Sequence, residues 1–150
     1  MKVRQWVQAW LESLSHYTIM NPGEDGQLVG YLTRYHLLRL FGFKLCLHHA
    51  LRSDGDRELH GHPWFWAGII VVGGYWEHRL SGVYRRRPGQ LLLVGRAKLH
   101  RLELPAGKTS WSLILMFPRL NHSWCFLQAG KLIPWVNFLR QKGIPLGKLD

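Results

Sequence analysis

The stretch His60-Gly61-His62-Pro63, followed by the apolar run Trp64 to Val72 and the turn Gly73-Gly74, decides the fold of this chain. Side chains alternate along a β-strand, so histidines at positions i and i+2 point to the same face. A third histidine, His100, lies in another strand-like segment further along the chain. If that face lines a small β-barrel, the three imidazoles converge where a divalent metal can be held.

Strand signals dominate most of the chain around this stretch. Short apolar segments separated by Gly and Pro turns recur about every 8–12 residues, which is typical of a sandwich or barrel. Upstream, apolar residues spaced by three and four positions predict an amphipathic helix that ends at Asn21-Pro22-Gly23 and packs against the outside of a sheet. A second, short helix is predicted near Pro134 to Gln141.

The expected fold class is therefore all-β, a double-stranded jelly-roll barrel with an N-terminal helix and a short C-terminal helix. At 150 residues the chain has the size of one domain. The predicted boundaries are the helix at 2–20, the barrel at about 28–127 and a C-terminal tail at 128–150, all within a single domain 1–150.

The composition predicts a soluble, cytoplasmic protein. The two cysteines, Cys46 and Cys125, each lie in an apolar strand-like segment, and no signal peptide is recognised at the start, so both thiols are expected to be reduced. No apolar stretch reaches the roughly 20 residues that a membrane helix needs, so no membrane partner is predicted.

The charge of the chain is strongly basic. Twenty Lys and Arg against nine Asp and Glu give +11, which leaves an anionic partner such as nucleic acid open. The basic residues are scattered, and Arg85-Arg86-Arg87 form the only run, which we expect at a solvated loop edge. A basic surface that keeps the chain soluble is the favoured interpretation, and no specific nucleic-acid partner is predicted.

These motifs resemble those of the cupin superfamily, the small RmlC-like jelly rolls that carry a metal in the barrel. The first cupin signature, G-x5-H-x-H-x3,4-E-x6-G, matches at His60, His62 and the closing Gly73 or Gly74. Asp54 stands at its opening glycine, and its glutamate position falls on Trp66 or Ala67. The block HGHPW…GGYWE is also similar to small bacterial and phage cupin-like proteins with an HxHPW…GGYxE pattern.

The second cupin signature, G-x5-P-x-G-x2-H-x3-N, is matched more loosely. Gly89 fits its glycine and His100 its histidine. Gly95, Ala97 and Leu104 replace the proline, the inner glycine and the asparagine. Three of the four ligand positions of the family are thus present. In lacking the glutamate, the chain resembles the thiol-dioxygenase branch, such as cysteine dioxygenase, in which a neutral three-His iron site works.

The resemblance implies a single divalent transition metal held by His60, His62 and His100. Iron(II) is favoured, although three imidazoles also suit Mn, Zn, Ni or Cu, and the alternative is that they are ordinary strand histidines. Glu77 is a candidate fourth ligand or general base, although strand alternation leaves open whether it or His78 faces inward.

Other residues are candidates for the cavity wall. Arg52 and Tyr75 are candidate substrate-binding residues, and the guanidinium fork of Arg52 would fit a substrate carboxylate. His48 and His49 are adjacent, so one of them must face each side of the sheet. His16, His36 and His122 are expected to be surface or packing residues.

Three functions are compatible with this pattern. The favoured one is a small-molecule metalloenzyme of dioxygenase type. The second is a non-catalytic cupin module that binds a sugar or other small ligand. The third is a metal-independent sugar isomerase or epimerase, which needs an inward Asp beside a barrel histidine, and no such Asp is identified. Small cupins often bury an outer sheet face by dimerising, so a homodimer stays open.

Overall fold

The computed structural model describes residues 2–22, 27–54, 58–95, 98–119 and 124–141, and within these the strands form two six-stranded antiparallel sheets. The first sheet has the order β1 (His16–Pro22), β2 (Leu28–Leu40), β3 (Phe43–Ala50), β10 (Ser110–Met116), β5 (Trp66–Val72), β8 (Leu91–Val94). The second sheet has the order β12 (Lys131–Pro134), β11 (Cys125–Gln128), β4 (His60–Gly61), β9 (His100–Glu103), β6 (Tyr75–Arg79), β7 (Gly82–Arg86). The helices are α1 (Lys2–Ser13) and α2 (Trp135–Gln141).

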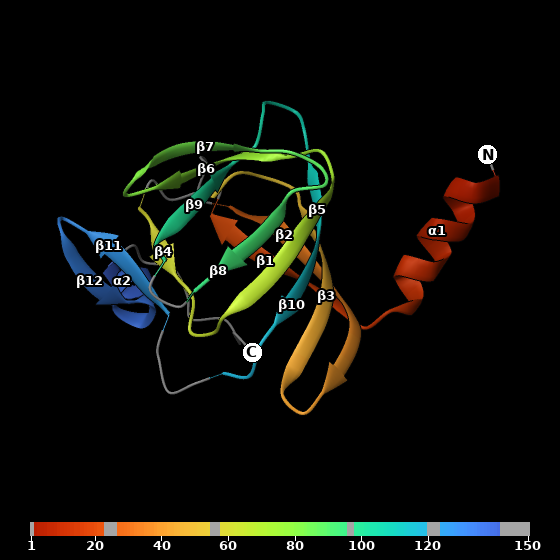
Figure 1. Cartoon of the computed structure of the whole chain (residues 1–150), viewed down its shortest axis with the longest axis horizontal. Helices are drawn as coiled ribbons and strands as arrows, with labels where there is room; N and C mark the ends of the chain where they lie inside the picture. The colour runs from red at the N-terminus through yellow and green to blue at the C-terminus, as the bar shows by residue number, and fades with distance from the viewer. Residues whose placement is uncertain (1, 23–26, 55–57, 96–97, 120–123, 142–150) are drawn as a thin grey trace.

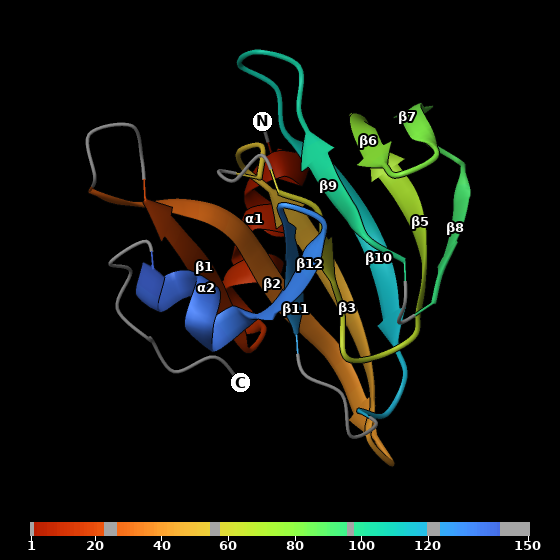
Figure 2. The ribbon, with the colours of Figure 1, turned by 90° about the vertical axis from the view of Figure 1, so that its left-hand side faces the viewer.

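The strand order is that of a jelly roll, as predicted. Strand β10 lies between β3 and β5, and β9 lies between β4 and β6, so the chain crosses repeatedly from one sheet to the other. Figure 2 shows the strands of the two sheets enclosing the interior. The predicted all-β class with a helix near each end is confirmed.

The N-terminal helix is shorter than predicted. It ends at Ser13 rather than near residue 20, and His16–Pro22 forms β1, which pairs with β2. Tyr17, Thr18 and Ile19 are aromatic and β-branched residues, which favour a strand over a helix. The sheet therefore begins at residue 16, not at residue 28.

The predicted packing of α1 against a sheet is wrong. Its apolar side chains are largely exposed: Trp6 is 77% exposed and Trp10 50% exposed, and among the helix side chains that the structure describes only Leu11 is buried. Figure 1 shows α1 standing apart from the strands. The spacing of apolar residues predicts an apolar helix face but does not say what covers it.

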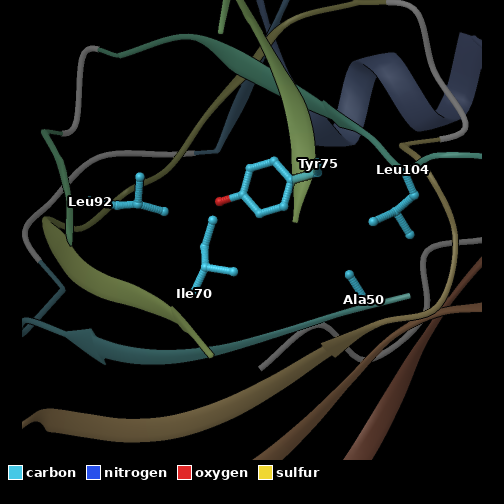
Figure 3. Close-up of a cluster of buried hydrophobic side chains, with 5 residues drawn as sticks. All are labelled: Ala50, Ile70, Tyr75, Leu92 and Leu104. Atoms are coloured by element: carbon cyan, nitrogen blue, oxygen red, sulfur yellow. The ribbon is translucent and has the colours of Figure 1, made fainter. Parts of the chain in front are cut away.

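The core lies between the two sheets. Figure 3 shows five buried side chains that point toward one another: Ala50, Ile70, Tyr75, Leu92 and Leu104. Ala50, Ile70 and Leu92 come from the first sheet, and Tyr75 comes from the second. A second buried cluster contains Cys46, Ile114 and Met116, all from the first sheet. Cys46 and Cys125 are both free thiols.

The turn Gly73-Gly74 carries the chain from β5 in the first sheet to β6 in the second. Both residues have positive φ, +83° and +125°. A Cβ atom added at Gly73 would lie 2.3 Å from the backbone oxygen of Thr109, and one at Gly74 would lie 2.4 Å from that of Arg86. Glycine is required here both for the backbone conformation and for the close approach of other strands.

The C-terminal helix α2 matches the predicted segment. Phe138 is buried, and its ring stacks on Phe126 of β11 with centroids 3.9 Å apart. Figure 1 shows α2 beside the hairpin β11–β12. No helix within the described ranges is long and apolar enough to cross a membrane.

Candidate metal centre

Two neighbouring strands of the second sheet bring three histidines together. His60 in β4 pairs directly with His100 in β9, and His62 follows immediately after β4. One ring nitrogen from each of the three side chains lies within 4.8 Å of the other two. Nε2 of His62 is 3.0 Å from Nε2 of His100. These are the three histidines that the spacing of the sequence selects.

The donor set fits a divalent transition metal. Burial lowers the pKa of His62 well below its usual value, and the neighbouring His60 and His100 lower it further. His62 is therefore neutral at pH 7, which is the form that binds a metal. Its Nδ1 atom is buried and has no hydrogen-bond partner within the described part of the chain.

Glu77 lies behind His100 rather than among the three-His ring nitrogens. Its Oε1 atom is 3.0 Å from Nδ1 of His100, and its side chain is 2% exposed. Oε1 also accepts from Nη2 of Arg79 at 2.8 Å, and Oε2 accepts from Nε of Arg86 at 2.7 Å. The sequence left open whether Glu77 or His78 faces inward, and the structure places Glu77 inward. Its carboxylate already contacts His100 and two guanidinium groups.

These neighbours hold Glu77 ionised. Burial alone would raise its pKa, but the hydrogen bonds from His100, Arg79 and Arg86 outweigh burial and lower the pKa to about 2. An ionised carboxylate is only an acceptor, so Nδ1 of His100 must carry the proton. His100 then presents the lone pair of Nε2 toward His62 and the centre of the group.

The position of Arg86 corrects the prediction of a solvated loop edge for residues 85–87. Arg86 belongs to β7 and reaches Glu77 with Nε and Nη2, at 2.7 and 2.6 Å. Arg85 lies with its guanidinium carbon 5.1 Å from the ring centroid of Trp76. A run of like charges favours a solvent position, but a buried carboxylate on the neighbouring strand supplies a partner for one of them.

A cavity of about 100 Å³ adjoins the three histidines. Near the three histidines its wall is aromatic and contains Trp64, Trp66 and Trp124, and Tyr75 also lines the cavity. Arg52, the other predicted substrate-binding residue, is exposed and is not among the lining residues. The cavity wall therefore comes from both sheets and contains Tyr75, but not Arg52, of the two predicted substrate-binding residues.

The adjacent histidines of β3 face opposite sides, as alternation requires. His48 lines the cavity, whereas His49 stacks on Trp111 with ring centroids 3.9 Å apart. Burial, aided by Arg34 and His36, lowers the pKa of His48 well below its usual value. His36 is buried, His16 is exposed, and His122 lies outside the described residues.

Sequence reasoning missed two polar residues of the interior. Asp54 accepts hydrogen bonds from the hydroxyl of Tyr31 and the backbone N–H of Leu102, and its Oδ2 lies 3.9 Å from Nδ1 of His60. The only signal for it was its position at the opening glycine of the first signature. Arg34, in the middle of β2, is buried and lines the cavity, and a charged residue inside an apolar strand segment was its only signal.

No protein-family model matches the sequence, and no curated protein matches it. Solved structures do match the fold. A cupin 2 conserved barrel domain protein from Rhodopseudomonas palustris is 13% identical, with a TM-score of 0.61 over 86% of this chain and 85% of that one. A cupin-2 domain protein from Rhodospirillum rubrum is 14% identical, with a TM-score of 0.60 over 85% and 82%.

A third match is the Fe(II) form of HppE, which is 10% identical with a TM-score of 0.55. The match covers 71% of this chain and 57% of HppE, so the chain spans just over half of that protein. At these identities the three matches establish the fold alone. This chain has the cupin fold.

Proposed function

We propose that this protein is a metal-dependent cupin that acts on a small molecule, with His60, His62 and His100 as the metal ligands. The observation that carries the proposal is the convergence of three ring nitrogens within 4.8 Å at the wall of a small cavity. Three neutral imidazoles suit divalent iron, manganese, nickel, copper and zinc. Iron(II) is the first metal to test, because the Fe(II) form of HppE shares the fold.

The site fits a catalytic centre better than a structural one. A structural site is normally closed by four protein ligands, whereas a catalytic site keeps a position open for substrate. Glu77 is the nearest candidate for a fourth ligand, but its two oxygens are already bonded to His100, Arg79 and Arg86. A bound metal would supply Lewis-acid chemistry and, in the case of iron, activation of oxygen.

The residues of the chain have separate roles in this proposal. Glu77 keeps the proton of His100 on Nδ1 and thereby directs Nε2 toward the group. Trp64, Trp66 and Trp124 line the cavity beside the histidines. Bulky indole side chains beside an open coordination position suit an oxygen-dependent reaction on a small substrate. We therefore propose dioxygenase-type chemistry, with thiols as the first substrate class to test.

The first experiment measures metal content and then turnover. Protein purified without chelator or metal-affinity tag is subjected to elemental analysis, together with His100→Ala and the control His16→Ala, which removes an exposed histidine. We expect about one metal per chain in the parent and the control, and none in His100→Ala. Oxygen uptake and product formation are then measured with the iron-loaded protein and a panel of thiols, diols and sugars. A parent protein that binds none of the five metals would overturn the metal site.

A second function is favoured by one contact. A metal-independent isomerase or epimerase needs a carboxylate beside a barrel histidine, and Oδ2 of Asp54 lies 3.9 Å from Nδ1 of His60 in the interior. This distance is too long for a hydrogen bond, so the pair would have to tighten on substrate binding. Sugar isomerisation by the protein after removal of metal with a chelator, lost in Asp54→Asn, would favour this function. Metal binding without any turnover would favour a non-catalytic binding module.

A further inference from the structure

Arg34 is a buried cation in the cavity wall whose partners are all neutral. It is 8% exposed and lines the same cavity as the three histidines. Its Nε donates to Nε2 of His48 at 2.9 Å, and its Nη1 donates to the hydroxyl of Tyr17 at 2.5 Å. No carboxylate within the described ranges lies in ion-pair distance of it; Glu77 pairs with Arg79 and Arg86, and Asp54 lies 3.9 Å from His60.

The surroundings of Arg34 form a polar row across the first sheet. Tyr17, Arg34, His48 and Ser112 are consecutive partners in the strand register. Because His48 accepts from Nε of Arg34, its own Nε2 carries no proton, and the ring is neutral. The row therefore orients the guanidinium but does not neutralise it.

The described side chains that line the cavity carry a net positive charge for this reason. Among the described residues that line it, Arg34 is the one permanent charge, and no Asp or Glu is present. A divalent metal on three neutral imidazoles would add two further positive charges. Burial of an unneutralised charge is costly, so natural proteins pair such a charge with a counter-ion. The space beside Arg34 is suited to a negatively charged group that the ligand itself brings.

The guanidinium of Arg34 also has enough remaining N–H donors to bind a carboxylate. Two of its five N–H groups make the hydrogen bonds to His48 and Tyr17, and Nη2 makes none within the described residues. A planar guanidinium matches a carboxylate with two parallel hydrogen bonds. Across the cavity wall, Nε1 of Trp124 is a buried donor that also has no partner in the described part of the chain.

We propose that the cavity binds a small carboxylate, whose anionic group is held by Arg34 while its other end reaches the three-His group. The contact of the ligand with the three-His group rests on the metal centre proposed above. The contact of its anionic group with Arg34 does not. The cavity volume of about 100 Å³ is small, so the ligand is a small molecule. This assigns to Arg34 the role that the sequence suggested for Arg52.

The test uses two thiols that differ only in the anionic group. Cobalt(II)-loaded protein is titrated with thioglycolate and with 2-mercaptoethanol, and binding is read from the visible absorption of the cobalt. We expect the parent protein to bind thioglycolate about 10- to 100-fold more tightly, the range for charge-assisted hydrogen bonds. Arg34→Met should reduce this preference to about threefold or less, with unchanged cobalt content and unchanged 2-mercaptoethanol affinity. Arg34→Lys should retain part of it, since the charge stays but the fork is lost.

Arg119→Met is the matched control, because Arg119 is exposed and is not among the lining residues. Equal affinity of the parent protein for the two thiols would overturn the proposal, and this comparison needs no variant to fold. A preference that survives in Arg34→Met would overturn it as well. If the parent protein binds no cobalt, the carboxylate site is tested in the absence of metal. Tryptophan fluorescence of the metal-free protein should then report saturable binding of acetate but not acetamide, and the absence of acetate binding would sink the proposal.

Discussion

Glu77 fixes the proton of His100 on Nδ1. Oε1 of the carboxylate lies 3.0 Å from that nitrogen, and the carboxylate stays ionised because Arg79 and Arg86 contact it too. Nε2 of His100 then has its lone pair available for a metal, and the ring cannot turn without breaking a buried hydrogen bond. In metal sites, such a carboxylate behind a ligand histidine sets the tautomer and raises the basicity of the ligand.

Glu77→Gln should lower metal affinity about 10- to 100-fold, the usual effect of removing such an outer carboxylate. A neutral amide can still contact Nδ1 of His100 but no longer compensates Arg79 and Arg86. Affinity is measured by competition with a chromophoric zinc or cobalt chelator, and folding by circular dichroism. Glu103→Gln is the control: Glu103 lies on the same sheet and contacts His78, but its side chain is 47% exposed. Equal affinity in both variants would contradict the role of Glu77.

The stability of the protein should fall as the pH drops from about 6.5 toward 5. The pKa of His48 is lowered in the folded state by burial, Arg34 and His36, so only the unfolded chain takes up a proton in this window. His48→Gln should reduce the slope of unfolding free energy against pH by up to ~1.4 kcal/mol per pH unit. Denaturant unfolding between pH 5 and 8 measures this slope. A slope unchanged in His48→Gln would show that the pKa of this histidine is not lowered in the folded protein.

His62 contributes to the loss of stability in the same pH window, because its pKa is also lowered in the folded state. Glu77, with a pKa of about 2, loses its stabilising contribution only between about pH 4.5 and 2.

The predictable part of this molecule is the part that depends on local pattern. The i, i+2 spacing of His60 and His62 and the glycine turn at 73–74 depend on strand alternation and backbone sterics, which act over a few residues. The placement of His100 beside them followed from the family signature, and the structure pairs it with His60. The jelly-roll class followed from the density of short strands and turns.

What could not be predicted depends on contacts between distant segments. Arg34 and Asp54 enter the interior because β2 and the segment after β3 pack against the second sheet, and no local pattern encodes this packing. The side chain of Arg86 is partly buried because it hydrogen-bonds Glu77 on the neighbouring strand. The exposed apolar face of α1 is the opposite case, since a clear local pattern is present but the strands do not cover it.

Removal of residues 1–13 should cost the barrel little stability. Trp6 and Trp10 are at least half exposed, and Leu11 is the only buried side chain described in α1, so the expected loss is at most about 2–3 kcal/mol. By contrast, Phe138→Ala should cost about 3–5 kcal/mol, because Phe138 is fully buried and stacks on Phe126. Denaturant unfolding of the three proteins gives the comparison. A truncated chain that no longer folds would mean that α1 contributes contacts beyond Leu11.

Gly73→Ala should destabilise the protein far more than Gly107→Ala, although both residues have positive φ, +83° and +65°. A left-handed backbone conformation costs an alanine about 1 kcal/mol or somewhat more at either position. At Gly107 the added methyl group meets no atom of the described residues within 4 Å, whereas at Gly73 it would lie 2.3 Å from the backbone oxygen of Thr109. That oxygen precedes β10 and cannot move without disturbing the sheet, so we expect a total loss of about 3 kcal/mol or more for Gly73→Ala.

The turn leads directly into β6, which carries Tyr75 and Glu77, so the same variant should also weaken metal binding while Gly107→Ala does not. Thermal unfolding and the chelator competition measure the two effects, and similar values for both variants would show that the close approach at Thr109 is not a constraint in solution.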